Sequence, residues 1–339
     1  MERIMKKKTL VSLLIILTLA LSACSGKAAN ANQESSNTVN ANQESSNTVN
    51  ANQESGTETA EGVTFTDSLD REVTVSNPQR VVTLLGSFCD EWLLAGGSVV
   101  GTASDSFTSF DLNLDESVVD VGSHLSPDVE RIIALEPDLV IASSMTDAQV
   151  ELLETLEGAG ITVAYFYVNN FSDYLESLDI FTRITGRADL YEEYGTKVAQ
   201  QIEEAKAQID GSKPTVLFIR AAASSVKVKG SKGTVGGEIL ADLDTVNIAD
   251  SESMLEDLSM EAVILADPDF IFVTTQGSDT EAALANVQEL MLDNPAWESL
   301  KAVKNGNYYV IEKSLYNSKP NARWGEAYKK LADIIYTKE

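Results

Sequence analysis

The chain has 339 residues, and its 52 acidic residues outnumber its 25 basic ones, which gives a formal net charge of −27 at neutral pH. Such an excess of negative charge repels phosphate backbones, so we expect no nucleic-acid partner. The sequence contains only two cysteines, Cys24 and Cys89, which excludes a disulfide framework and a cysteine-cluster zinc site.

The first residues predict a secretion signal. Arg3 and three lysines at 6–8 precede an uncharged apolar run from Leu10 to Leu19. That run is shorter than the roughly 20 apolar residues that a membrane-spanning helix requires, so we interpret residues 1–23 as a signal peptide. Its end, Leu21-Ser22-Ala23-Cys24, resembles the lipobox of bacterial lipoproteins. This resemblance implies that Cys24 is lipidated and anchors the chain at the outer, extracytoplasmic face of the cytoplasmic membrane.

A repeated polar segment follows. Residues 31–40 read ANQESSNTVN, residues 41–50 repeat them, and a third copy begins at Ala51. The repeats lack aromatic residues and have little apolar surface to offset the entropy of ordering. Residues 24–61 are therefore predicted to be the lipidated cysteine followed by a disordered linker.

Residues 62–339 are long enough for two domains. Short apolar runs bounded by Gly, Pro or Asp predict two sets of buried strands: Val81–Leu85, Val99–Val100, Leu139–Ala142 and Thr162–Tyr167, then Thr215–Ile219, Val226–Val228, Phe270–Thr274 and Tyr308–Ile311. Because helical stretches separate these strands, we expect parallel sheets covered on both faces. The fold class is α/β, with an N-terminal lobe over residues 62–186 and a C-terminal lobe over residues 212–339.

One long helix is predicted between the lobes, within residues 187–211. The span Ala188–Ile209 has no proline and only one glycine, Gly195, and its apolar residues recur at helical spacing. Two Rossmann-like lobes joined by one long α-helix are therefore expected.

The two lobes contain similar segments. Leu125-Ser126 precedes Glu130 and then Glu136-Pro137-Asp138 with an apolar run, and Leu258-Ser259 precedes Glu261 and then Asp267-Pro268-Asp269 with another. Each pattern predicts a serine N-cap, an acid in the first turn of a short helix, a Pro-Asp turn and a buried strand.

Several blocks together resemble the substrate-binding proteins of ABC importers for iron siderophores, haem and cobalamin. These blocks are Phe65–Val75 with Asn77-Pro78, Val121–Glu130, Glu136–Val140 and Asn317–Tyr328. The resemblance implies a monomeric binding protein that holds its ligand in a cleft between the lobes. Its partners would be a permease dimer and its ATPase. It also implies that Glu130 and Glu261 dock onto arginines of the permease, although both are also acids that a helix dipole favours.

Ligand-binding residues are expected where the strands of both lobes end. The candidates are Phe88, Phe107, His124, Tyr167, Arg220, Lys229, Tyr316 and Arg323. The basic residues among them favour an anionic group on the ligand. Together with the resemblance, this implies a ferric siderophore as the leading ligand, with haem and cobalamin as alternatives; His124 could ligate haem iron or be an ordinary loop residue.

Neither a resident cofactor nor a bare metal site is expected, because His124 is the only histidine. The sequence has no phosphate-binding loop and no Gly-x-Ser-x-Gly motif, so we expect no enzyme. The segment Gly230–Gly237 is interpreted as a turn before a helix, and Cys89 as a buried thiol. A surface adhesin that does not transport a ligand remains an alternative.

Overall fold

The computed structural model describes residues 62–110, 112–250 and 260–337. The predicted signal peptide, Cys24 and the repeat linker lie outside these residues. Within the described part, no helix is both long and apolar enough to cross a membrane.

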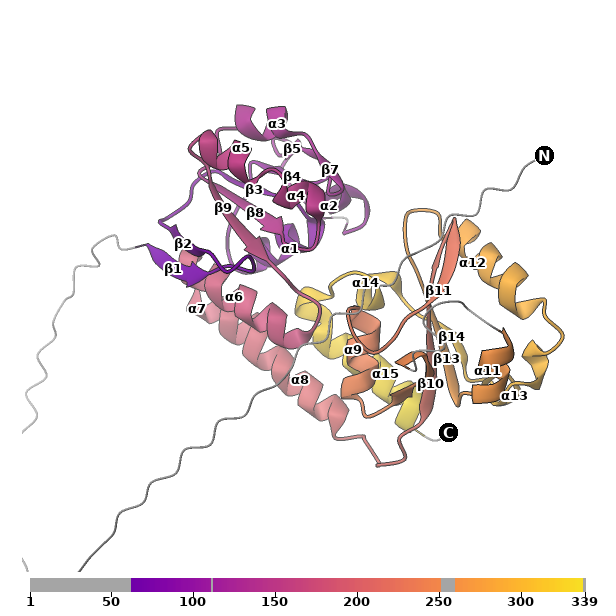
Figure 1. Cartoon of the computed structure of the whole chain (residues 1–339). Helices are drawn as coiled ribbons and strands as arrows, with labels where there is room; N and C mark the ends of the chain where they lie inside the picture. The colour runs from indigo at the N-terminus through magenta and orange to yellow at the C-terminus, as the bar shows by residue number, and fades with distance from the viewer. Residues whose placement is uncertain (1–61, 111, 251–259, 338–339) are drawn as a thin grey trace, which may run out of the picture. The chain divides into compact units, whose positions relative to one another are not determined.

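The first lobe contains a five-stranded parallel sheet with the strand order β5-β4-β3-β8-β9 (Figure 1). Its strands are β3 (Val81–Thr83), β4 (Gly101–Thr102), β5 (Val119–Asp120), β8 (Leu139–Ser143) and β9 (Thr162–Phe166). Every residue of β8 is buried, as expected for a central strand covered on both faces. Its helices are α1 (Gly86–Leu94), α2 (Asp105–Thr108), α3 (Val129–Ala134), α4 (Asp147–Val150), α5 (Leu153–Gly158) and α6 (Phe171–Thr185).

Two antiparallel strand pairs accompany this sheet: β1 (Val63–Thr66) with β2 (Glu72–Val75), and β6 (Gly122–Ser123) with β7 (Ser126–Pro127). The strand predicted at Val99–Val100 was placed two residues too early, because β4 occupies Gly101–Thr102. A side chain at Gly101 would lie 2.6 Å from Leu135 Cδ1, so glycine there lets Leu135 pack closely against the strand. The two valines that precede the strand, Val99 and Val100, therefore resemble a buried strand in the sequence more than Gly101 and Thr102 do.

The second lobe contains a sheet with the strand order β11-β10-β13-β14, with β12 also pairing with β10. The strands are β10 (Thr215–Ala222), β11 (Ser225–Val228), β12 (Val246–Asn247), β13 (Phe270–Thr275) and β14 (Tyr308–Val310). All pairings are parallel except that β11 folds back antiparallel on β10. Its α-helices are α9 (Val235–Asp242), α11 (Met260–Ala266), α12 (Thr280–Val287), α13 (Lys301–Lys304), α14 (Lys313–Tyr316) and α15 (Trp324–Tyr336).

Short helical turns complete the second lobe. They are the 3₁₀ turns η2 (Ile248–Asp250), η4 (Trp297–Ser299) and η5 (Asn321–Arg323), and the π turn η3 (Gln288–Leu292). The parallel sheets and the two lobes confirm the predicted fold class.

The chain between the lobes is helical from Ala188 to Lys206. It consists of α7 (Ala188–Tyr191), the π turn η1 (Glu192–Thr196) and α8 (Lys197–Lys206). The one glycine of the predicted helix, Gly195, lies in the π turn, where an added side chain would come within 3.2 Å of Leu175 on α6. Helix α15 packs along α8, as Figure 1 shows.

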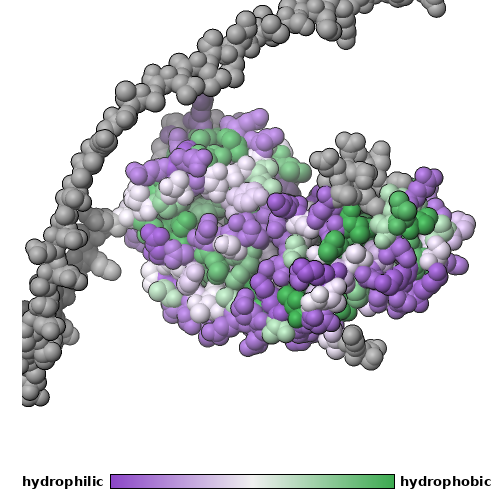
Figure 2. Space-filling view, turned by 60° about the horizontal axis from the view of Figure 1, so that its bottom comes forward, coloured by the Kyte–Doolittle hydropathy of each residue, from purple (hydrophilic) through white to green (hydrophobic). Residues whose placement is uncertain are grey.

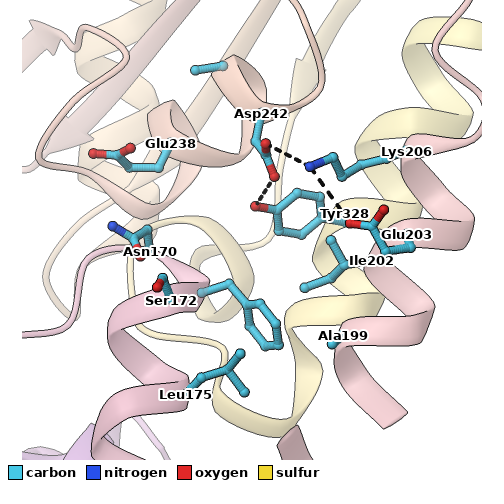
Figure 3. A pocket seen from close by; sticks show the side chains of 12 residues that line it. Asn170, Ser172, Leu175, Ala199, Ile202, Glu203, Lys206, Glu238, Asp242 and Tyr328 are labelled. Atoms are coloured by element: carbon cyan, nitrogen blue, oxygen red, sulfur yellow. Dashed lines mark hydrogen bonds and ion pairs between the residues drawn. The ribbon is translucent and has the colours of Figure 1, made fainter. Parts of the chain in front are cut away.

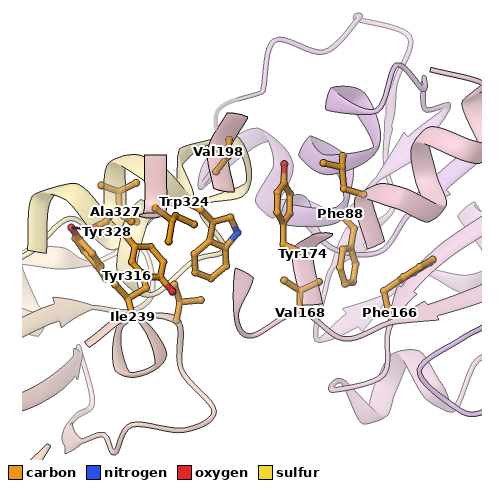
Figure 4. Packing of buried hydrophobic residues seen from close by; sticks show 14 of the residues in the cluster. Phe88, Phe166, Val168, Tyr174, Val198, Ile239, Tyr316, Trp324, Ala327 and Tyr328 are labelled. Carbon is orange, nitrogen blue, oxygen red and sulfur yellow. Dashed lines mark hydrogen bonds between the residues drawn. The ribbon is translucent and has the colours of Figure 1, made fainter. Parts of the chain in front are cut away.

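One hydrophobic cluster extends from the first lobe into the second (Figure 4). It includes Phe88 and Phe166 of the first lobe, Val198 of α8, and Trp324 and Tyr328 of α15. Burial of large aromatic side chains contributes about 1.5–3 kcal/mol each, so this cluster stabilises the junction of the lobes. On the face shown in Figure 2, hydrophilic residues predominate and hydrophobic ones form separate small patches.

The two similar segments build similar structures. Glu136 and Asp267, the residues before the two prolines, both adopt a left-handed backbone, with φ of 46° and 41°. The aspartates that follow then bind the start of the neighbouring strand: Asp138 accepts hydrogen bonds from Gln79 N and Arg80 N, and Asp269 accepts one from Thr215 N. The predicted short helix, Pro-Asp turn and buried strand are confirmed in both lobes.

The predicted serine N-cap is wrong in the first lobe. Asp128 caps α3 and accepts a hydrogen bond from Arg131 N, whereas Ser126 lies in β7. Ser259, the serine predicted to cap the second short helix, lies outside the described residues.

Candidate functional site

A pocket of about 280 Å³ is lined by residues from both lobes, close to the carboxyl ends of β3, β8, β10 and β13. Ends of parallel strands are where α/β sheets place their ligands. The lining residues are Leu85, His124, Leu125, Ser143, Met145, Thr146, Asn169, Phe218, Arg220, Gly233, Thr234, Val235, Gln276, Tyr316, Asn317 and Lys319.

The first-lobe side of the pocket is held by Gln149, which is fully buried. Its side-chain amide donates to the backbone oxygens of Leu84 and His124, at 2.8 and 2.9 Å, and accepts from Ser143 N at 2.7 Å. One side chain therefore fixes the ends of β3 and β8 and the turn between β6 and β7. That turn places His124 at the pocket, with its Nδ1 3.9 Å from Asp105 Oδ2.

Arg220 lies near the end of β10 and forms the basic part of the second-lobe wall. Burial lowers the pKa of its guanidinium, and Arg220 forms no ion pair within the described part of the chain. Lys227 lies directly opposite it on β11. The pKa of Lys229 is lowered by burial and then by the charges of Arg220 and Lys227, so this hairpin concentrates positive charge.

The loop between β11 and α9 packs closely against α9 at Gly237. A side chain at Gly237 would lie 2.3 Å from the backbone oxygen of Gly230, so only glycine permits this approach. The expected turn before a helix is confirmed, since α9 begins at Val235. Thr234, which precedes α9 and lines the pocket, has a buried hydroxyl with no hydrogen-bond partner.

Lys319 enters the pocket from the segment between α14 and η5. Two residues further on, Asn321 is fully buried, with φ of 50°, and its amide donates to Ser87 O at 2.9 Å and to Asp90 Oδ2 at 2.7 Å. Both acceptors belong to α1 of the first lobe. Asn321 therefore ties the second lobe to the first directly beside Lys319.

The apolar surface of the pocket comes from two buried rings and two exposed side chains. Phe218 and Tyr316 form the buried part, and the Tyr316 hydroxyl donates to Ala327 O. Leu125 and Met145 are more than half exposed. Tyr167 does not line the pocket, but its hydroxyl contacts the amide of Asn169, which does.

Five candidate residues lie outside the pocket lining: Tyr167 and Lys229, which are hydrogen-bonded to lining residues, and Phe88, Phe107 and Arg323. Phe88 is fully buried and packs edge-on against Phe166, so it belongs to the core. Phe107 lies on α2 and is partly exposed. Arg323 binds Glu312 and Glu326, at 2.9 and 2.7 Å, which leaves its guanidinium engaged on the surface.

The sequence argument missed Lys319, Asn169, Thr234 and Gln149. Arg323 was named as a further positive charge for the ligand within the segment Tyr316–Trp324, and Lys319, four residues earlier in that segment, was not named. The sequence feature that could have drawn attention to Lys319 is the following Pro320. A residue before proline is biased away from a helix and towards an extended or turn conformation.

A larger cavity, of about 640 Å³, lies among α6, α8, α9 and α15 (Figure 3). Its charged groups already bind each other: Asp242 accepts from Lys206 Nζ at 2.9 Å and from the Tyr328 hydroxyl at 3.0 Å. Glu203 and Glu238 add further carboxyl groups. We favour the smaller pocket as the ligand site, because its lysine and arginine side chains form no ion pair with any residue that the structure describes.

Glu130 and Glu261 occupy equivalent places in the two lobes. Each is the second residue of a short helix, α3 or α11, and each is exposed. Neither lines the pocket. The structure thus separates this pair of carboxylates from the candidate ligand site.

Cys89 is a fully buried free thiol, and burial raises its pKa, as expected for an unreactive core cysteine. Across the part of the chain that the structure describes, no group of three or more His, Cys, Asp or Glu side chains is arranged to hold a metal ion.

Comparison with known proteins identifies the family. The profile of the periplasmic binding protein family matches residues 82–315. A putative ABC transporter substrate-binding lipoprotein of Bacillus subtilis, YhfQ, is 24% identical over 92% of this chain and 93% of its own length. The Fe(3+)-citrate-binding protein YfmC of the same organism is 27% identical over 91% of this chain and 90% of its own length.

A solved structure shows the same fold. The petrobactin-binding protein YclQ from Bacillus subtilis superposes with a TM-score of 0.66 at 20% identity, covering 82% of this chain and all of that one. The family match extends over most of the folded part, from β3 to α14, and includes both sheets. This chain belongs to the periplasmic binding protein family.

Proposed function

We propose that this chain captures a ferric siderophore outside the cytoplasmic membrane and delivers it to an ABC importer. The observation that carries the proposal is the pocket lined by both lobes, in which Arg220 has no counter-ion among the described residues although the chain as a whole is strongly acidic. A partly buried charge without a partner is costly, so an anionic ligand would stabilise it. The family, and a relative named as an Fe(3+)-citrate-binding protein, support iron as the cargo.

Within this proposal, the ligand contacts Arg220, His124 and Tyr316, with Lys229 and Tyr167 close to the pocket. Phe88, Phe107 and Arg323 are left out of the proposed site because of their placement. The chelate itself would hold the iron, while the protein supplies positive charge, hydrogen-bond donors and an apolar surface.

Haem is the second candidate ligand, and one observation favours it. His124 lines the pocket, and its side chain is 36% exposed, so an imidazole nitrogen could reach a haem iron. The propionates of haem would then pair with Arg220.

We also propose that Glu130 and Glu261 dock the protein onto its permease, one from each lobe. Their equivalent, exposed positions at helix starts support this, because a dimeric permease presents the same surface twice. Exposed carboxylates outside the pocket can pair with basic residues of a partner without disturbing a bound ligand. Charge reversal at both positions should therefore stop uptake and leave ligand binding intact.

For the N-terminal residues, we propose a signal peptide over residues 1–23, lipidation at Cys24 and a linker to residue 61. The lipobox-like sequence and a relative named as a lipoprotein support the anchor. If the full chain and its Cys24→Ser variant partitioned alike between detergent and water, the anchor proposal would be wrong.

The test of capture is fluorescence titration of the full chain, purified in mild detergent, with ferric citrate, a ferric hydroxamate, a ferric catecholate, haem and cobalamin. Trp92, Trp297 and Trp324 are the reporters, and coloured iron complexes quench indole emission by energy transfer. We expect saturable quenching by a ferric siderophore that is lost in Arg220→Glu. Saturable quenching by haem alone would favour the second candidate, and no response to any ligand would favour a surface adhesin.

A further inference from the structure

Lys319 lies in the pocket on a segment that is held in place from both lobes. Pro320 follows it and is buried, and Asn321 is fixed to α1 by its two side-chain hydrogen bonds. On the other side, α14 ends at Tyr316, whose ring is itself part of the pocket. The backbone of Lys319 is therefore fixed, and its ammonium group is confined to the space between the lobes.

The charge of Lys319 is only partly compensated by the acids near it. Lys319 forms no ion pair with any described residue, and burial lowers the pKa of its ammonium group, against the opposing effects of Glu91 and Asp105. Burial also raises the pKa of Glu91 to about 8, so at neutral pH this carboxyl is mostly protonated. The fully buried acid beside Lys319 is thus a poor counter-ion.

Ten of the nineteen lysines and arginines in the described part of the chain are in ion pairs. Those in ion pairs are Arg71, Arg131, Arg183, Arg187, Lys206, Lys213, Lys301, Arg323, Lys329 and Lys330. The pocket, in contrast, is lined by two basic side chains without an ion pair in the residues described, Arg220 and Lys319. In a chain with twice as many acidic as basic residues, two unpaired basic side chains in one pocket indicate a binding function.

The two basic groups lie in different parts of the pocket. Arg220 belongs to the β10–β11 hairpin and acts on the pKa of Lys229, whereas the acids that act on Lys319 are Glu91 of α1 and Asp105 of α2, both in the first lobe. A ligand with one anionic group facing each of these two parts of the wall would neutralise both.

We propose that Lys319 is a specificity-determining residue, which together with Arg220 selects a ferric chelate bearing at least two separate negatively charged groups, such as free carboxylates, over a neutral chelate. The inference rests on the proposed function and narrows its substrate class. Burial of each basic group costs desolvation free energy, which an anionic group of the ligand would offset. A neutral ferric hydroxamate would leave both groups unpaired.

The test compares ferric citrate with ferrichrome, a neutral ferric hydroxamate, by titrating the full chain in detergent by calorimetry. We expect ferric citrate to bind more tightly, and Lys319→Met to weaken its binding roughly ten- to hundredfold, as expected for loss of a charge-assisted hydrogen bond. The variant Lys319→Arg, which keeps the charge, should restore most of the affinity. Lys197→Met is the matched control, because Lys197 is exposed on α8, outside the pocket, and should bind as the wild type does.

Two outcomes would overturn the inference while leaving ferric capture in place: equal affinity for ferrichrome and ferric citrate, or unchanged citrate affinity in Lys319→Met. If the protein bound neither of these chelates and no other ligand of the panel, both the proposed function and this inference would be overturned. Unfolding curves of Lys319→Met and Lys319→Arg show whether a loss of affinity comes from the charge or from a loss of folded protein.

Discussion

Glu91 is the most strongly perturbed acid of the interface between the lobes. It lies fully buried on α1, its Oε1 accepts a hydrogen bond from the Ser177 hydroxyl, and its Oε2 has no partner. Burial is the largest cause of its raised pKa; the nearby charge of Asp90 raises it further, and Ser177 and Lys319 act in the opposite direction. A carboxyl in this position is stable only when it is protonated.

This has a consequence for the pH dependence of stability. Because the folded-state pKa is about 8 and the ordinary value is about 4.5, the folded protein binds more protons between these values than the unfolded chain does. The stabilisation is therefore full below the ordinary value and is lost as the pH rises towards 8. We expect the free energy of unfolding of the wild type, relative to Glu91→Gln, to fall across this range in urea titrations.

The control is Glu154→Gln, which removes an exposed carboxyl from α5. A stability difference between the wild type and Glu91→Gln that does not vary with pH would show that Glu91 is not a buried neutral acid.

Single residues also show how far the sequence could predict the site. Arg220 and His124 follow apolar runs, and the rule that ligands bind at strand ends selects them directly. Phe88 follows such a run too, but it lies in the first turn of α1, where the helix directs it into the core. Gln149 escaped notice because its role depends on contacts with distant segments, which no local pattern records.

At the scale of elements, the segment from η5 into α15 joins the lobes through Asn321. Its φ of 50° is one that asparagine tolerates better than other residues with a side chain, and its amide donates to a carbonyl and a carboxylate of α1. The position requires both this backbone conformation and these two hydrogen bonds.

We expect Asn321→Ala to lower the free energy of unfolding by about 2–4 kcal/mol, because it removes both hydrogen bonds, leaves Asp90 without its donor and strains the backbone. Asn321→Gly removes the same bonds but relieves the strain, so it should cost less. Urea denaturation measures both values. An alanine variant within about 0.5 kcal/mol of the wild type would mean that this contact does not hold the lobes together.

How clearly a strand could be predicted from the sequence depended on how much of it is buried. Strands such as β8, buried along their whole length, appear in the sequence as continuous apolar runs, and the Pro-Asp turn can be recognised because its pattern occurs once in each lobe. Strands of two residues, such as β5 and β12, have no such run and were not predicted. The π turn at Gly195 could not be predicted either, because it depends on how α6 packs against it.

For the whole molecule, fold and family could be predicted from the sequence because many weak blocks occur in the right order. The choice of ligand could not, because it depends on which basic groups remain unpaired once the chain is folded. Arg323 and Arg220 look alike in the sequence, yet one is engaged by Glu312 and Glu326 and the other has no counter-ion in the described chain.

The central claim, that this protein binds a ferric chelate and hands it to an importer, is tested most directly by measuring uptake and binding in the same variant. Cells carrying Glu130→Arg with Glu261→Arg would be given the ferric chelate that the purified protein binds, labelled with radioactive iron. The matched control is Glu154→Arg with Glu289→Arg, which makes the same charge change at exposed acids of both lobes.

The account predicts that uptake falls at least about tenfold in the first variant, because the introduced arginines repel the basic residues of the permease. The dissociation constant of the chelate should stay within about twofold of the wild-type value. The control variant should take up iron as the wild type does. Undiminished uptake in the first variant, or loss of chelate binding together with uptake, would contradict the separation of capture from delivery.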